Sequence, residues 1–360
     1  MVGVTINGRF LTRPGPGVNR FALELLRAWL PLHARRERIT ITVPRATSPP
    51  PDVAEFRVRG RAAGRFGGHA WEQLQLSATC GDDVLLSLCN SGPISRRRQV
   101  AVIHDASPLA FPRAYNRRFR GWYRWLISGL MLRSAVVATV SRFSADELRR
   151  HTGIRRGVIE VIHESGEHIL DTPSSPQVLG RLGIENRPYV LAVGSRTVNK
   201  NLIGVIHAAK MLDAFGITVV AAGGSQDRIF SGADPVGAGV VLAGYVTDGE
   251  LRALYEGARC FVFPSFYEGF GLPPLEAMHC GCPVVVSNRA SLPEVCGDAA
   301  VYCEPDDPTD IARQIQNVVT SEARRAELRE AGYERVRKFS WARAAADLED
   351  ILVRNFAWGT

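Results

Sequence analysis

Two glutamates eight positions apart mark the segment Phe263–Ala277, which reads FPSFYEGFGLPPLEA. Glu268 lies in a glycine-flanked loop, and Glu276 lies in the first turn of a helix that Pro273–Pro274 begin. A helix N-terminus attracts anions through its dipole and its free N–H groups. A phosphate bound there would have one glutamate on each side, as a sugar linked to a nucleoside diphosphate requires. A purely local interpretation makes Glu276 a dipole-stabilising acid and Glu268 a turn residue.

A second loop could bind the phosphates of such a ligand. The apolar run Tyr189–Val193 is followed by GSRTVNKN at residues 194–201. Lysine is rare in the chain, with only three lysines among 44 basic residues. Arg196 and Lys200 could clamp a diphosphate, the arginine by its planar fork and the lysine as a point charge. The alternative is two solvated loop cations.

The first half of the chain contributes a glycine-rich loop and a His-Asp pair. Residues 12–18, TRPGPGV, contain Gly15 and Gly17 and open a helix, so backbone N–H groups could approach an anion there. The loop matches no dinucleotide or P-loop fingerprint and could be a simple turn. His104 ends an apolar strand, where it could bind a sugar while Asp105 sets its tautomer, and a structural histidine is an equal alternative.

These residues all follow apolar runs that predict strands. The runs alternate with helical patterns, which predicts parallel sheets covered by helices, an α/β fold. The predicted strands are 4–7, 39–43, 84–88, 100–104, 135–140, 157–162, 189–193, 217–222, 240–242, 260–263, 283–286 and 300–302. Helices are expected over residues 18–29, after Asn199, Thr247, Pro273 and Thr309, and from the N-cap Ser340 onward.

The length of 360 residues and the 46% apolar content predict two globular domains, and Asp171–Pro176 has the composition of a linker. Apolar runs long enough for a spanning helix are interrupted by charge, and the N-terminal residues do not resemble a signal peptide. The seven cysteines form no CxxC pair, so we expect reduced thiols and no metal site.

Charge differs sharply between the two halves. Residues 1–176 carry 26 arginines, no lysine and 14 acids, whereas residues 177–360 carry 18 basic and 22 acidic residues. The basic half could meet a membrane face or a lipid diphosphate, or could simply be solvated. Arginines in 96–98 and 113–124 are the candidate contacts, the second interleaved with Tyr115, Phe119, Trp122, Tyr123 and Trp125. No nucleic-acid motif accompanies them, so we expect no nucleic-acid partner.

The segment from Glu268 to Glu276 resembles the E-x7-E motif of the family-four retaining glycosyltransferases, which have the GT-B fold. The similarity extends along almost the whole chain. Other matching elements, in the order of the family, are the glycine-rich loop, His104–Asp105, Thr139–Ser141, the 194–201 loop, Gly244–Val246 with Leu251 and Tyr255, Ser291–Val295 and Gly297–Asp298. The chain departs from the family at Asn199, where arginine is common, and at 161–167, where an Asn-Gly turn is usual.

The resemblance implies two Rossmann-like domains facing across a cleft. It assigns residues 1–172 and 343–360 to an acceptor-side domain and residues 173–342 to a nucleotide-sugar domain. It also implies a role for each candidate residue: Arg196 and Lys200 on the diphosphate; Glu276 on the ribose; Glu268 with Gly269, Phe270, Gly271 and Leu272 on the donor sugar; His104 on the transferred sugar, beside Asp105; Gly15 and Gly17 near the phosphates; Tyr245 and Val246 shaping the donor pocket.

The implied reaction is metal-independent, retaining transfer of a hexose or deoxyhexose, as in mannosyl- or rhamnosyltransferases of bacterial polysaccharide and lipopolysaccharide synthesis. No cofactor is expected; the nucleotide-sugar donor, with GDP-mannose favoured, is a substrate. The acceptor would be a glycan or a lipid-diphosphate-linked glycan, and the enzyme would be cytoplasmic, with peripheral contact at the inner membrane face. A soluble small-molecule acceptor, a sugar-nucleotide epimerase or hydrolase, and a non-catalytic sugar-nucleotide sensor are the alternatives.

Overall fold

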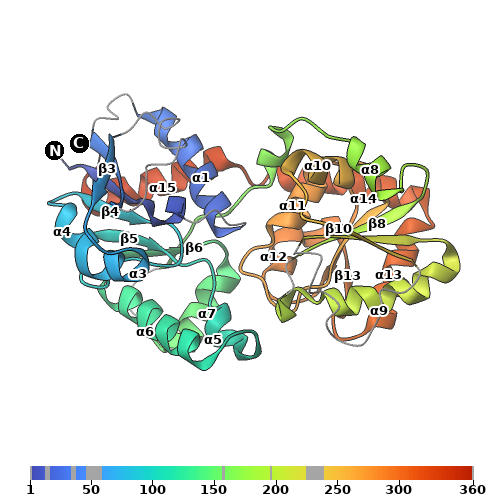
Figure 1. The fold of residues 1–360 in the computed structure, drawn as a ribbon, viewed down its shortest axis with the longest axis horizontal. Coiled ribbons are helices and arrows are strands. Elements are labelled where there is room, and N and C mark those ends of the chain that lie inside the picture. Colours follow the sequence, from blue (N-terminus) through green and yellow to red (C-terminus); the bar gives the residue numbers. More distant parts are fainter. Residues whose placement is uncertain are drawn as a thin grey trace. The chain divides into compact units, whose positions relative to one another are not determined.

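The computed structural model describes residues 2–12, 17–33, 38–45, 59–155, 159–194, 197–223 and 239–358. The chain forms two compact units (Figure 1): unit 1 is Met1–Glu164 with Trp341–Thr360, and unit 2 is Ser165–Ser340. The boundary therefore follows Glu164 rather than residue 172. Residues just after it belong to unit 2, because Gly166 packs against the backbone of Glu276.

Unit 1 is built on a parallel sheet in the order β3-β2-β1-β4-β5-β6-β7. Its strands are β1 Val4–Asn7, β2 Ile39–Pro44, β3 Arg59–Ala63, β4 Val84–Ser87, β5 Gln99–Val102, β6 Val136–Thr139 and β7 Ile159–Val161. Six of them were predicted. The edge strand β3 was missed because its sequence, RGRAA, lacks the β-branched and aromatic residues that strands favour.

The helices of unit 1 include the end of the chain. They are α1 Val18–Trp29, α3 Gly68–Trp71, α4 Ser77–Thr79, α5 Ser107–Ala110, α6 Arg117–Arg133, α7 Arg142–Thr152 and α15 Trp341–Phe356. The predicted C-terminal helix α15 lies beside α1 (Figure 1). Trp29 of α1 donates from Nε1 to Glu349 Oε2 at 2.8 Å, and the Phe21 and Trp341 rings lie 6.0 Å apart.

Unit 2 repeats the architecture with the sheet order β10-β9-β8-β11-β12-β13, again parallel throughout. Its strands are β8 Tyr189–Val193, β9 Thr218–Ala222, β10 Val240–Gly244, β11 Cys260–Phe263, β12 Val284–Ser287 and β13 Ala300–Cys303. Its helices are α8 Gln177–Leu182, α9 Leu202–Leu212, α10 Asp248–Gly257, α11 Leu272–His279, α12 Leu292–Cys296, α13 Pro308–Val319 and α14 Glu322–Val336. All six strands, and the helix starts expected after Asn199, Thr247 and Thr309, agree with prediction to within a few residues.

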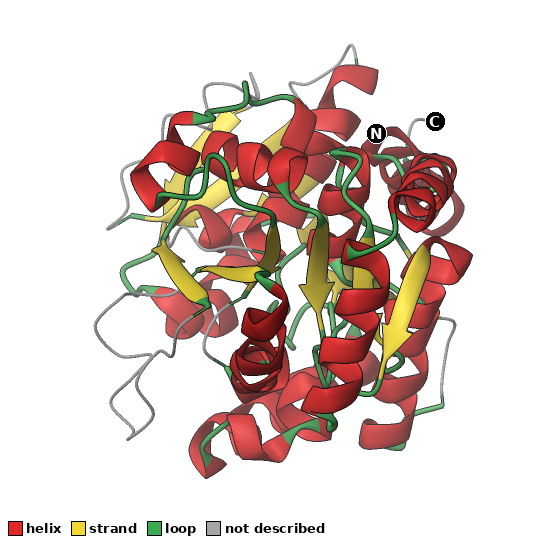
Figure 2. Cartoon of the chain, turned by 90° about the vertical axis from the view of Figure 1, so that its right-hand side faces the viewer, coloured by secondary structure: helices red, strands yellow, loops and turns green. Residues whose placement is uncertain are grey.

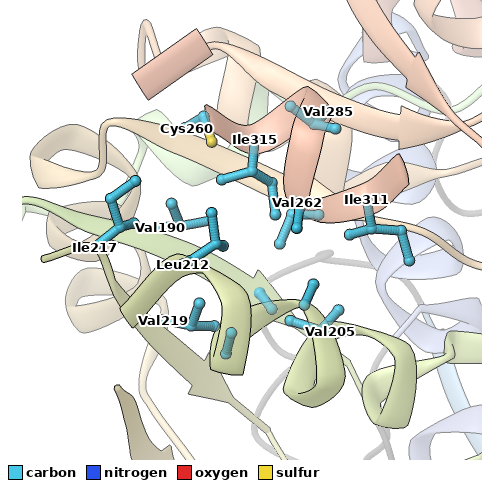
Figure 3. Packing of buried hydrophobic residues seen from close by; sticks show 14 of the residues in the cluster. Val190, Val205, Leu212, Ile217, Val219, Cys260, Val262, Val285, Ile311 and Ile315 are labelled. Carbon is cyan, nitrogen blue, oxygen red and sulfur yellow. The ribbon is translucent and has the colours of Figure 1, made fainter. Parts of the chain in front are cut away.

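The sheet of unit 2 is buried on both faces by helices (Figure 2). On one face, Val190 and Val262 pack with Leu212 of α9 and Ile315 of α13 in a continuous apolar cluster (Figure 3). On the other face, the ring of Phe261 meets the ring of Tyr255 of α10 at 5.3 Å. Burial on both faces explains why these strands are uninterrupted apolar runs rather than alternating patterns.

In each sheet, the order in which successive strands are added reverses at one pair of adjacent strands. In unit 1 the pair is β1 and β4, and in unit 2 it is β8 and β11. Loops leave such a pair in opposite directions at the carboxyl edge and open a crevice, where α/β sheets bind ligands. The predicted α/β class with two Rossmann-like parallel sheets is confirmed. No helix in the described parts of the chain is both long and apolar enough to cross a membrane.

The core of unit 2 provides a test of this packing. Leu212 is buried in the cluster, whereas the neighbouring Met211 on the same helix is 42% exposed. Leu212→Ala should lower the free energy of unfolding by about 2–5 kcal/mol, because it removes apolar contacts and leaves a cavity. Met211→Ala should change it by about 0.5 kcal/mol or less. Urea titrations followed by far-UV circular dichroism compare the two, and equal losses would contradict the assigned packing.

Candidate active site

The crevice between β8 and β11 brings together residues from the two loops that the sequence singled out. The loop after β8 carries Lys200, and the loop after β11 carries Glu268. Lys200 donates from Nζ to both carboxylate oxygens of Glu268, at 2.7 Å and 2.8 Å. The ammonium group also lies 5.1 Å from the centre of the Phe263 ring. Arg196, the other expected cation, lies outside the described residues.

Asparagines join these two loops. The backbone carbonyl of Asn199 accepts from Phe266 N at 2.7 Å, and its side chain donates to the carbonyl of Tyr267 at 3.3 Å. Asn201 adopts a left-handed backbone with φ of 54° and caps α9 by accepting from Gly204 N. Its Nδ2 also donates to Pro264 O at 3.1 Å and to Pro305 O at 2.7 Å. The position of Lys200 is therefore fixed by the residues on either side of it.

A buried serine anchors the Glu268 loop from the next connection. Ser291 Oγ lies 3.0 Å from Glu268 O and 2.6 Å from Phe270 O, so its hydroxyl hydrogen-bonds the loop backbone. Gly271 follows with φ of 112°, a conformation that side chains rarely adopt, and α11 begins directly after it. Gly269, Phe270, Gly271 and Leu272 form one short connection, buried like Glu268 itself.

The start of α11 offers fewer backbone donors than an ordinary helix. Of the four residues that open it, Pro273 and Pro274 have no N–H group. The expectation of several free N–H groups aimed at the loop is therefore corrected, because the two prolines remove two of the N–H groups that a helix start normally leaves free. The helix dipole still favours negative charge at this end.

Glu276 is buried on α11 and held by two donors from other elements. It is the fifth residue of the helix, so it lies in the second turn rather than in the predicted first turn. Tyr255 of α10 donates its hydroxyl to Glu276 Oε2 at 3.1 Å. His168, in the 3-10 helix Glu167–Leu170, places Nε2 3.0 Å from Glu276 Oε1. Gly166 lets this segment approach, since a Cβ there would stand 2.5 Å from Glu276 N. Of these partners, only Tyr255 was quoted from the sequence, and no spacing pattern connects any of them to Glu276.

Two side chains near Glu276, Tyr255 and His279, are uncharged at neutral pH. Burial, and then the carboxylate of Glu276, raise the pKa of Tyr255 well above its ordinary value. Burial, and then the proximity of His168, lower the pKa of His279, one turn further along α11, to about 4. Tyr255 is therefore a permanent donor, and His279 is neutral.

Tyr245 and Val246 directly follow β10 at the same carboxyl edge of the sheet. Tyr245 is 83% exposed and Val246 is partly buried. An exposed aromatic ring at this edge is available to a ligand.

In unit 1, the environment of His104 differs from the expected one. Its Nδ1 lies 3.2 Å from Glu164 Oε1 and its Nε2 lies 3.0 Å from the carbonyl of Leu88, both of which are acceptors. Asp105 instead accepts from Ser107 N at 2.8 Å, where it stabilises the turn into α5. The carboxylate beside the ring is thus Glu164, and the prediction that Asp105 sets the tautomer is wrong. Glu164 was missed because it is distant in sequence and follows another strand.

The glycine-rich loop is described only at its end. Gly17 is exposed, has φ of 72° and caps α1, whereas Gly15 lies outside the described residues. At the β1–β4 crevice lies a buried polar cluster that no sequence pattern indicated. Glu72 Oε1 accepts from Asn7 Nδ2 at 2.6 Å, from Arg9 Nε at 3.2 Å and from Ser91 Oγ at 2.9 Å.

Glu72 lies in a π-helical turn, Glu72–Leu76, a feature frequent at functional sites. Burial alone would raise its pKa, but hydrogen bonding from His69 and the charge of Arg9 keep it below the ordinary value.

All seven cysteines are free thiols. Burial raises the pKa of Cys280 to about 12 and raises that of Cys282 well above its ordinary value. Among the described residues, no group of His, Cys, Asp or Glu is arranged to hold a metal ion.

Comparison with known proteins identifies the family. Residues 178–335 match the family described as glycosyl transferases group 1, and residues 16–164 match glycosyltransferase family 4. O-antigen chain mannosyltransferase B of Escherichia coli is 33% identical over 261 residues, which cover 69% of this chain and 68% of that protein. The chain belongs to glycosyltransferase family four. This glycosyltransferase is thus an enzyme of the hexosyltransferase class.

Other relatives differ in length or in sequence. The serotype-specific mannosyltransferase WbdA of Escherichia coli is 32% identical over 69% of this chain, but the match spans only 32% of WbdA. Among solved structures, sucrose-phosphate synthase from Thermosynechococcus elongatus superposes with a TM-score of 0.75 over 99% of this chain and 100% of that one, at 18% identity. The glycosyltransferase therefore has the GT-B fold.

The lowered pKa of His279 predicts a pH dependence of stability. Folded His279 binds a proton only near pH 4, whereas the unfolded residue binds one near pH 6.5, so the unfolded state takes up more protons between these values. This contribution to stability is complete above pH 6.5 and is lost as the pH falls toward 4. His279→Met should lack it, so the wild type should lose stability relative to the variant between pH 7 and pH 4.5. Melting temperatures across this range measure the difference, and a pH-independent difference would contradict the assignment.

Proposed function

We propose that the enzyme transfers a hexose or deoxyhexose, with GDP-mannose as the favoured donor, to a lipid-linked or polysaccharide acceptor. The anomeric configuration is retained and no metal ion takes part. The relatives named O-antigen chain mannosyltransferase support the mannosyl donor and the glycan acceptor. The absence of an Asp-x-Asp sequence supports a metal-independent mechanism.

The observation that carries the proposal is the pairing of Lys200 with Glu268 in the β8–β11 crevice. The Glu268 loop leads into α11, and Glu276 lies in the second turn of that helix. Three chemistries meet there: a cation for phosphate, a carboxylate for sugar hydroxyls, and a second carboxylate for ribose. We assign Lys200 and Arg196 to the diphosphate, and Glu276 to the ribose. Glu268 and the backbone from Gly269 to Leu272 bind the donor sugar, and Tyr245 and Val246 border the nucleotide.

Catalysis in this proposal is electrostatic. The leaving diphosphate gains negative charge as the glycosidic bond breaks, and cationic groups stabilise that charge. The ammonium of Lys200 has three hydrogens, of which the carboxylate of Glu268 receives two, so one remains for a phosphate oxygen. The acceptor hydroxyl attacks on the face that the diphosphate leaves, and the diphosphate takes its proton.

The roles of the unit 1 residues follow from the resemblance. We assign His104, with Asp105 beside it, to the transferred sugar, and Gly15 and Gly17 to the phosphates. Both ring nitrogens of His104 already have acceptors inside unit 1. A hydrogen bond from the ring to a sugar would therefore replace the contact with Leu88 or the contact with Glu164.

We place the enzyme in the cytoplasm, in peripheral contact with an anionic membrane face, and helix α6 supports this placement. The helix exposes Phe119, Trp125 and Leu132 at 38%, 52% and 59%, and Arg117 and Arg118 at its start line a hollow of about 540 Å³. Exposed aromatic and aliphatic side chains beside arginines are typical of segments that bind the membrane interface. A lipid-linked acceptor would be presented at the same surface.

Donor binding is tested by the stabilisation that ligands confer. UDP, GDP, dTDP, ADP and CDP are compared by thermal shift, each with and without EDTA. A diphosphate at about 100 times its Kd should stabilise the enzyme by about 2.7 kcal/mol. We expect GDP to give the largest shift, EDTA to have no effect, and Lys200→Gln to abolish most of the shift. If no diphosphate binds, or if binding requires a metal ion, the proposal fails.

Membrane contact is tested with large unilamellar vesicles containing phosphatidylglycerol. The enzyme should co-sediment with them at low salt and be released at high salt, since the attraction is electrostatic. The double variant Arg117→Glu, Arg118→Glu should bind more than about tenfold more weakly, because each arginine contributes about 1 kcal/mol near such a surface. The matched control reverses the charge of two exposed arginines of unit 2 by the substitutions Arg313→Glu and Arg337→Glu. It should bind like the wild type. Equal binding by both double variants would refute the contact through α6.

A further inference from the structure

We propose that Tyr255 and His168 are positioning residues that orient the carboxylate of Glu276 to accept both hydroxyls of a ribose, and that they thereby determine selectivity for ribonucleotide donors. The inference rests on the proposed function, in which Glu276 binds the ribose.

Three separate elements meet at this carboxylate. Glu276 lies on α11, Tyr255 on α10 and His168 in the 3-10 helix after the unit boundary. The two donors approach different oxygens, Tyr255 the Oε2 atom at 3.1 Å and His168 the Oε1 atom at 3.0 Å. A carboxylate held at both oxygens cannot rotate about its terminal bond without breaking a hydrogen bond, so its plane is fixed.

The number of acceptor positions matches a vicinal diol. An ionised carboxylate has about four lone-pair sites, two on each oxygen. Tyr255 and His168 occupy one site on each oxygen, which leaves one on each. Adjacent hydroxyls on a ribose can donate to the two oxygens of a single carboxylate. The side chain of Glu276 is buried but retains about 10% of its exposure, so a ligand can still reach part of it.

The protonation of the neighbours supports this arrangement. Tyr255 keeps its proton because burial and Glu276 raise its pKa, and His279 is neutral because burial and His168 lower its pKa to about 4. Neutral Tyr255 is thus a fixed donor to Glu276. Gly166 completes the arrangement, because any larger residue there would push the His168 segment away from α11.

The test measures selectivity rather than binding alone. The probes are the ribonucleoside diphosphate, among UDP, GDP, ADP and CDP, that stabilises the wild type most, and its 2′,3′-dideoxy analogue. Hydrogen bonds to a charged group should make the wild type bind the ribonucleotide at least about tenfold more tightly. Tyr255→Phe removes one donor, so the ratio of the two Kd values should fall by about threefold or more, through weaker binding of the ribonucleotide alone. Isothermal titration calorimetry gives both constants.

His168 permits a rescue experiment. In His168→Gln the side-chain amide can still donate to Oε1, whereas in His168→Leu it cannot. Selectivity should be largely retained in the glutamine variant and lost in the leucine variant. The control is Tyr302→Phe on β13, which removes a hydroxyl that donates to Gly297 O and does not contact Glu276. Its selectivity should equal that of the wild type.

The outcomes separate this inference from the proposed function. If the wild type binds no diphosphate, the proposed function fails and this inference fails with it. If the wild type binds but does not distinguish the dideoxy analogue, the ribose assignment of Glu276 is wrong. If the wild type distinguishes the two ligands and Tyr255→Phe and His168→Leu do so equally well, or weaken both ligands equally, Tyr255 and His168 are only structural and the inference is overturned.

Discussion

Removing a carboxylate from water is costly unless donors replace the water, and this constraint shapes both carboxyl edges of the enzyme. Four buried glutamates at these edges each receive hydrogen bonds from a different set of donors. Glu72 is held by Arg9, Asn7 and Ser91; Glu164 by His104; Glu268 by Lys200; Glu276 by Tyr255 and His168. Every pairing joins chain segments that are distant in sequence. The loops that could bind a donor are therefore positioned by the need to compensate buried charge.

The four carboxylates differ in how well they can still accept hydrogen bonds from a ligand. Glu72 has three partners at Oε1 and His69 at Oε2, and its side chain has no exposure, so no ligand can reach it. It can only be architectural. Glu276 has two donors and a partly accessible edge, and the partner of Glu268, Lys200, keeps 23% of its side-chain exposure. The charged groups that a ligand can still reach therefore lie in the unit 2 crevice, where the proposed donor site lies.

Local pattern was sufficient to predict the sheets, because runs such as Tyr189–Val193 are buried on both faces and are apolar throughout. It was also sufficient for Lys200 and Glu268, because each follows a strand at a carboxyl edge. It could not reveal His168 or Glu164 as partners of Glu276 and His104. Their roles depend on which segments meet in three dimensions, and a single histidine or glutamate in a loop has no spacing signature. Asp105 was preferred to Glu164 only because it is the neighbour of His104 in sequence.

The departure from the family at Asn199 has a structural explanation. An asparagine here can donate to the carbonyl of Tyr267 while its own carbonyl accepts from Phe266, so it ties the Lys200 loop to the Glu268 loop. An arginine would add charge, but it could not make the same short side-chain bridge. Compared with a family member that has arginine at this position, the crevice has a more firmly held Lys200–Glu268 pair and one cation fewer. Since that pair is nearly neutral and two prolines remove N–H donors from α11, little positive charge remains in the described part of the crevice. In the proposed function, Arg196 is the residue that supplies the additional charge for the diphosphate.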